Sequence, residues 1–281
     1  MSLETLIPLV LRTSIMLTVF SLGLQATLDD ALMLFRRPGK LLRSLLAVNV
    51  IMPILALLLA KGLHLHPAVQ LALIALSVSP VPPLLPKKQL KAGGGESYVI
   101  GLLFALSLLS VVLIPVSIAI MGRVFGSDVS VPAGAIFKIV STSLLAPLLV
   151  GLLVRRLARG FAERVAGPLS KIAMIVLLLG VLPILVKAWP AVQSLIGDGT
   201  LMATTLFVVA GVLVGHLLGG PAPEDRVVLA LATASRHPAI ALTIAKSTFP
   251  EEKLVAAAIV WFLLVSAIVT AIYMKLQKRR Q

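Results

Sequence analysis

The chain has 281 residues, of which 59% are hydrophobic and only 13% are charged, with 25 basic and 11 acidic side chains and no cysteine. Soluble domains are about one-quarter charged, so this composition excludes an ordinary soluble domain, and the lack of cysteine excludes disulfides, thiolate metal sites and haem attachment. Aromatic residues make up 5% of the chain, too few for a basic nucleic-acid-binding surface with stacking side chains.

Nine apolar segments follow one another along the chain, each long enough to cross a bilayer as an α-helix. They cover residues 5–28, 42–60, 67–92, 97–121, 133–154, 170–190, 200–219, 226–248 and 253–275. The N-terminus lacks a basic region followed by a small-residue cleavage site, so we expect no removable signal peptide. The pattern predicts an all-α polytopic membrane protein with about nine transmembrane helices.

The basic residues gather in alternate loops. The rich set of loops holds Arg36, Arg37, Lys40, Arg43, Lys87, Lys88, Lys91, Arg155, Arg156, Arg159, Arg164, Lys171, Arg226, Lys275, Lys278, Arg279 and Arg280, and the poor set holds Lys61, Arg123, Lys187, Lys246 and Lys253. Because basic loops stay in the cytoplasm, we predict an integral protein of a bacterial inner membrane, with the N-terminus outside and the C-terminus inside.

Prolines interrupt the third and the eighth segments. The third contains "SVSPVPPLLPKK", and the eighth contains "SRHPA". Proline removes an amide donor and clashes with the preceding turn, so each helix should break there. We expect the breaks near residues 79–83 and 236–238, with Pro82, Pro83 and Pro238 in the first turns of the second half-helices.

The two interrupted segments occupy equivalent positions in two halves of opposite orientation. This pattern predicts an inverted repeat, with a four-helix unit at 1–122, a five-helix unit at 132–276 and a basic cytoplasmic tail at 277–281. Transporters of this design bind substrate at the midplane, between two crossed, discontinuous helices.

The order of several motifs resembles the bile acid:sodium symporter family. They are "FSLGLQATLDD", "RPGKLLRSLLAVNVIMPILALLLA", "LIALSVSPVPP", "ATASRHPAIALTIA" and "FPEEKLVAAAIVW". The resemblance implies a core domain and a panel domain, and sodium-coupled transport of bile acids, other organic anions or small carboxylates. It covers most of the chain.

The chain departs from that family where its members bind sodium. At the first break the family reads Pro-Gly-Gly-Thr-x-Ser-Asn, and a gapless match places Leu85 and Pro86 at the Ser and Asn positions. At the second break it reads Glu-x-Gly-x-Gln-Asn, and Ala232, Arg236 and His237 stand at the Glu, Gln and Asn positions. Sodium needs hard oxygen ligands. We therefore expect no sodium at these positions, no other metal and no cofactor.

Arg236 lies near the middle of the eighth segment, far from either membrane surface. A permanent charge at that depth usually marks a pathway or a site. One hypothesis is that Arg236 replaces the family's sodium and binds an organic anion through its guanidinium fork, aided by the N-terminal ends of two half-helices. The alternative is a structural arginine that donates to backbone carbonyls inside the bundle.

Other polar and proline residues near the breaks complete the candidate substrate site. They are His237, Ser235, Thr233, Ser79, Pro80, Pro82, Pro83 and Asn49. Each short hydroxyl side chain is expected to cap its own helix turn more readily than to contact a ligand. His237 either takes part in proton coupling or stays neutral and bonds a carbonyl of the broken helix. Gln25 is a weaker candidate.

Three lysines after the first break, Lys87, Lys88 and Lys91, also have two interpretations. They anchor the helix end at the inner surface, which the loop rule favours, or they line an inward cavity and attract anions.

The sequence therefore predicts a secondary transporter of a small organic anion, working by alternating access without the usual sodium sites. Two alternatives remain: a sodium- or proton-coupled symporter with rearranged ion sites, and a non-transporting binding or receptor protein on the same fold. An enzyme is not expected, because no catalytic constellation is visible. The expected partners are the anion and the lipid bilayer, and nucleic acid is not expected.

Overall fold

The computed structural model describes residues 3–124, 133–197, 199–248 and 251–278, with the side chains of 3–8 and of Ala133 left out. All the regular structure in these ranges is helical. In order, the helices are α1 (Leu3–Gly23), α2 (Leu28–Leu32), α3 (Pro38–Leu45), η1 (Leu46–Ile51), α4 (Met52–Gly62), α5 (Pro67–Val78), α6 (Leu85–Lys91), α7 (Glu96–Val124), α8 (Ala133–Val140), η2 (Ser141–Leu145), α9 (Ala146–Leu157), α10 (Arg159–Gln193), α11 (Thr200–Leu218), α12 (Pro223–Ala234), α13 (Pro238–Thr248) and α14 (Val255–Lys278).

The helices match the nine predicted segments. Within the described ranges, seven helical stretches are long and apolar enough to cross a membrane, and Leu9–Gly23 and Pro67–Val78 are shorter apolar helices that belong to the first and third segments. Many large apolar side chains remain exposed along the outer helix faces, for example Leu58, Val186 and Leu217. A soluble protein rarely leaves such faces uncovered, whereas lipid tails would cover them. The chain is an integral membrane protein.

Both predicted breaks are present. Segment three stops at Val78 and resumes at Leu85, and segment eight stops at Ala234 and resumes at Pro238. Pro238 opens α13 as expected, but the expectation for Pro82 and Pro83 was wrong. They lie in the break before α6, and Pro86 occupies the first turn. Pro82 and Pro83 disfavour helix in the residues before them, Val81 and Pro82, so the helix starts only at Leu85, with Pro86 in its first turn.

Segments two and five each contain a short π-helical turn, η1 and η2. Each is followed by a helix with proline at its second position, Pro53 in α4 and Pro147 in α9. Proline cannot donate to the carbonyl four residues back, and its ring crowds that carbonyl. The widened turn before each proline relieves this crowding, and such turns are frequent at functional sites. Val48 and Asn49 lie in η1.

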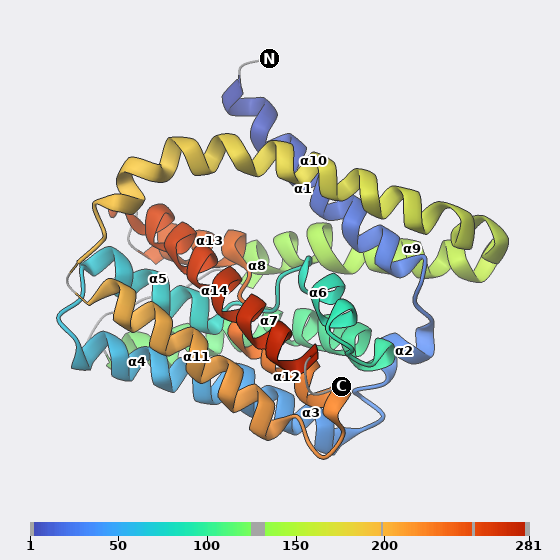
Figure 1. The fold of residues 1–281 in the computed structure, drawn as a ribbon, viewed down its shortest axis with the longest axis horizontal. Helices are drawn as coiled ribbons and strands as arrows, with labels where there is room; N and C mark the ends of the chain where they lie inside the picture. Colours follow the sequence, from blue (N-terminus) through green and yellow to red (C-terminus); the bar gives the residue numbers. More distant parts are fainter. Residues whose placement is uncertain (1–2, 125–132, 198, 249–250, 279–281) are drawn as a thin grey trace.

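Two groups of helices pack side by side. We call α1, η2, α9 and α10 the panel group, because α1 packs against α9, α10 and η2, and α9 packs against α10. The helices α3 to α6 and α11 to α14 form the core group, which contains both breaks. Figure 1 shows α10 arching along the upper edge with α1 crossing it, while α3, α4, α5 and α11 lie below. The proposed repeat boundaries at 122 and 132 stay a prediction, and residues 125–132 and 279–281 lie outside the described ranges.

The core group is held by close backbone contact between α11 and α12. Gly211, Gly215 and Gly219, spaced four residues apart, face α12. A Cβ atom on Gly215 would lie 2.4 Å from the carbonyl oxygen of Leu229, so only glycine permits this approach. Small residues at such spacing let membrane helices pack at short range. The first half of segment eight, α12, therefore packs closely against α11.

Candidate functional site

The two breaks contact each other directly. The backbone amide of His237 donates to the carbonyl oxygen of Pro80 at 2.9 Å, and Nη1 of Arg236 donates to the carbonyl oxygen of Ser79 at 3.3 Å. The interrupted helices thus cross at their breaks, as the sequence predicted. We call this place the crossing: Ser79–Leu84, Ser235–His237 and the η1 turn beside them.

Backbone groups freed by the breaks find partners inside the protein. The carbonyl of Ala234, at the end of α12, accepts from Oγ of Ser266 on α14 at 3.0 Å. The amide of Ser79 donates back to Leu76, and that of Ser235 donates back to Ala232. Broken helices at membrane depth need such internal satisfaction, because lipid offers no hydrogen bonds. The crossing is accordingly packed and closed.

Arg236 is the largest fully buried side chain of the described residues, with 1% of its surface exposed. Nη1 reaches Ser79, and Nη2 donates to the carbonyl oxygen of Val48 in η1 at 3.1 Å. Nε has no partner among the described residues. Two of the three guanidinium nitrogens therefore hold main-chain carbonyls, as the structural alternative expects, and the fork that would grip a carboxylate is partly occupied.

The charge of Arg236 is surrounded by the negative ends of dipoles. The half-helices α5 and α12 both end at the crossing, so their C-terminal ends, which carry partial negative charge, lie beside the guanidinium. The described residues contain three salt bridges, and none involves Arg236. Backbone dipoles thus do here what a carboxylate does for most buried cations. The same combination of unwound carbonyls and half-helix C-termini coordinates sodium in transporters with broken helices.

The N-terminal ends of the second half-helices offer few amides for an anion. Pro82, Pro83 and Pro86 have no amide hydrogen, and the amide of Leu85 donates to the carbonyl oxygen of Pro82. On the other side, Nδ1 of His237 accepts from the amide of Ile240 in the first turn of α13. The expected anion cradle of free amides is therefore small.

The hydroxyl side chains near the breaks bond within their own helices. Ser79 donates to Leu76, Ser77 to Ile74 and Thr233 to Leu229, and Ser235 lies buried beside them. Two further atoms at this level have no hydrogen-bond partner among the described residues, Nε2 of His237 and Oδ1 of Asn49. Together with Nε of Arg236, they are buried side-chain atoms at or beside the crossing that have no hydrogen-bond partner among the described residues.

The sodium positions implied by the resemblance carry no acidic side chain. Leu85, Pro86 and Ala232 are buried, and their side chains contain no oxygen. Among the described residues, no group of three His, Cys, Asp or Glu side chains is placed to hold a metal ion.

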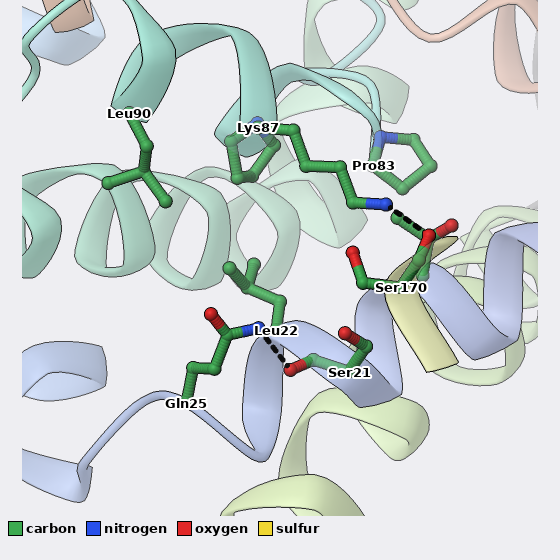
Figure 2. A pocket seen from close by; sticks show the side chains of 9 residues that line it. Ser21, Leu22, Gln25, Pro83, Lys87, Leu90 and Ser170 are labelled. Atoms are coloured by element: carbon green, nitrogen blue, oxygen red, sulfur yellow. Dashed lines mark hydrogen bonds between the residues drawn. The ribbon is translucent and has the colours of Figure 1, made fainter. Parts of the chain in front are cut away.

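A cavity of about 80 Å³ lies beside the crossing, between the panel and core groups. Figure 2 shows Ser21 and Leu22 of α1 and Gln25, just after α1, on one wall, with Pro83, Lys87 and Leu90 on the opposite wall and Ser170 of α10 at its edge. We call it the interface cavity. Of the sequence candidates, Pro83, Lys87 and the weaker candidate Gln25 line it, whereas Arg236, His237 and Asn49 do not. The sequence offered an inward cavity lined by Lys87 only as one of two interpretations, and it did not indicate Thr18, Ser21 or Ser170, because residues from three distant segments form the cavity.

Comparison with known proteins assigns the chain to a family. The model of the sodium bile acid symporter family matches residues 13–195, which is most of the chain. The chain belongs to this family. The match ends before segment eight, so it includes the first break but not Arg236.

A curated relative in Bacillus subtilis (strain 168) is described as an uncharacterized sodium-dependent transporter, YocS. It is 25% identical over 211 residues, covering 72% of this chain. The matched part spans 60% of the relative's length. The chain is thus a member of the sodium bile acid symporter family that has an arginine, Arg236, at its crossing.

Proposed function

We propose that the chain is a secondary transporter of small organic anions in which the side chain of Arg236 replaces a bound sodium ion. The observation that carries the proposal is the placement of the guanidinium. It donates to carbonyls of two different segments and lies at the C-terminal ends of α5 and α12. A cation bound there neutralises two converging half-helix ends and joins the breaks.

A tethered cation has a definite consequence for transport. A sodium ion enters and leaves with each cycle, so its gradient drives the substrate, but an arginine cannot leave. Transport by this chain would then follow the gradient of the anion itself, or exchange one anion for another. The membrane would be the bacterial inner membrane, with the N-terminus outside as the loop charges predict.

Sodium coupling is the second candidate, because the relative's printed name calls it sodium-dependent. It would require an ion cage at rearranged positions. Proton coupling would require protonation of the buried His237, whose Nε2 has no partner among the described residues.

The test is uptake into proteoliposomes containing the purified protein, with radiolabelled taurocholate and propionate as probes. Replacing sodium by potassium or choline at constant pH should change uptake by no more than about twofold, equivalent to about 0.5 kcal/mol. A protonophore should change it equally little. Uptake that rises tenfold with a sodium gradient would overturn the proposal in favour of the second candidate, and uptake that needs a proton gradient would favour His237.

A further inference from the structure

The interface cavity contains a charged side chain that the crossing does not use. Nζ of Lys87 donates to the carbonyl oxygen of Ser170 on α10 at 2.9 Å (Figure 2). This bond joins the broken segment to the panel group. None of the three salt bridges of the described residues includes Lys87, so its ammonium has no carboxylate partner there.

The neighbouring lysines behave differently. Lys88 and Lys91 are exposed, whereas Lys87 is half-buried and lines the cavity. The anchor interpretation fits Lys88 and Lys91, whose ammonium groups can reach the membrane surface. It does not account for an ammonium directed inward against α10.

A second polar group lines the same cavity. Thr18 of α1 is 1% exposed, and its hydroxyl has no hydrogen-bond partner among the described residues. A buried hydroxyl without a hydrogen-bond partner costs free energy. We therefore infer that the hydroxyl of Thr18 binds a ligand reversibly. One turn further along α1, Ser21 donates to Ala166, and the amide nitrogen of Gln25 donates to Ser21.

The size and lining of the cavity limit what it can take. A water molecule occupies about 30 Å³ in the liquid, and drug-sized ligands need several hundred. A volume of about 80 Å³ therefore fits a short carboxylate or the head of a longer one. Leu22, Leu90, Pro83 and Pro86 supply apolar walls for a short alkyl chain.

We propose that the interface cavity is a carboxylate-binding site on the cytoplasmic half of the protein, in which Lys87 supplies the charge and Thr18 a hydroxyl donor. It rests on the proposed function in that the bound carboxylate is the transported anion, met on the inward side. A carboxylate bound to Lys87 competes with the carbonyl of Ser170. Binding thereby loosens the bond between the broken segment and α10, and the two helix groups become free to move against each other.

The test uses a single cysteine as a reporter, which the cysteine-free chain makes possible. Leu90→Cys places a thiol on the cavity wall, and the rate of its alkylation by N-ethylmaleimide is measured in purified protein. Potassium acetate should slow alkylation, and acetamide, which is uncharged and of similar shape, should not. Lys87→Met should raise the half-protecting acetate concentration at least tenfold, whereas the matched control Lys88→Met should change it less than twofold.

Three results would overturn the proposal: no protection by acetate, equal protection by acetamide, or equal effects of Lys87→Met and Lys88→Met. Lys87→Arg keeps the charge and should retain protection, and Lys87→Gln serves if Lys87→Met is not recovered as a monodisperse protein. The assay needs neither transport nor Arg236. Protection without measurable uptake would therefore fault only the proposed function, and uptake without protection would fault only the cavity site.

Discussion

The crossing and the interface cavity each contain a basic side chain that forms none of the salt bridges of the described residues, but they use it in opposite ways. Arg236 is 1% exposed and donates to two carbonyls, whereas Lys87 is half-buried and makes one hydrogen bond across a boundary between helix groups. A planar guanidinium with several donors suits a fixed multipoint contact, and a flexible ammonium suits exchange between partners. In the two proposals above, one cation holds the core together and the other receives the anion.

Removing the fixed cation should have the largest effect. Arg236→Ala leaves the carbonyls of Ser79 and Val48 without their donor and two helix ends without their compensating charge. Each unsatisfied buried group costs about 1–3 kcal/mol, so we expect a loss of roughly 2–5 kcal/mol, measured by thermal or denaturant unfolding of the purified protein. Arg236→Lys should recover part of it, because a point charge reaches fewer acceptors.

The matched control is Arg12→Ala. Arg12 is exposed on α1, so its loss should change stability by no more than about 0.5 kcal/mol. If Arg236→Ala were as stable as Arg12→Ala, the guanidinium would not be holding the crossing. If it were stable and also kept its uptake, the substitution for sodium would have no support.

Restoring the family's residues at the second break should exchange the fixed cation for a free one. In Ala232→Glu combined with Arg236→Gln and His237→Asn, sodium should stabilise the protein where potassium does not. A ligand at ten times its Kd adds about 1.4 kcal/mol to the stability of the folded state. Leu85 and Pro86 provide no side-chain oxygen at two of the family's sodium-ligand positions. The affinity of the triple variant for sodium should therefore be weak.

The control for this triple variant is Arg236→Gln alone, which lacks the carboxylate and should show no sodium effect. Thermal shifts in sodium and potassium chloride at equal ionic strength measure the difference. Equal shifts in the two salts would mean that the crossing cannot be converted to an ion site by these residues. The arginine at position 236, where the family has glutamine, would then be one of several differences from the family that exclude sodium.

The fold could largely be predicted from the sequence, since each of its determinants is local. Apolar length set the helices, and prolines in the third and eighth segments set the breaks. The errors were also local. Pro82 and Pro83 were expected in the first turn of the second half-helix, whereas α6 begins at Leu85 and has Pro86 in its first turn. The π-helical turns were not predicted, although Pro53 and Pro147 signalled them.

The site could be predicted only in part, because its contacts join distant segments. The sequence placed Arg236 at membrane depth, but its acceptors are Ser79 and Val48, which lie 157 and 188 residues away. Nothing local distinguishes Lys87 from Lys88. Their difference arises because Lys87 lines a cavity together with residues of α1 and α10 and donates to Ser170. Packing of this kind has no periodic signature in the chain.

The smallest predicted effects on stability compare two hydroxyl groups one turn apart on α1. Thr18 has no hydrogen-bond partner among the described residues, whereas Ser21 has one. Thr18→Val keeps the shape of the side chain but removes a buried hydroxyl that has no partner among the described residues. Ser21→Ala removes a hydroxyl that donates to Ala166. Stability should therefore rise by about 0.5–1 kcal/mol in the first variant and fall by about 1 kcal/mol in the second.

Acetate binding should respond in the opposite sense to stability at Thr18. In the Leu90→Cys background, Thr18→Val should raise the half-protecting acetate concentration severalfold, because the carboxylate loses one donor and keeps Lys87. A hydroxyl that served only packing would leave acetate protection unchanged. A loss of stability in Thr18→Val equal to that in Ser21→Ala would show instead that the hydroxyl already has a partner within the protein, and the cavity would lose its second polar contact.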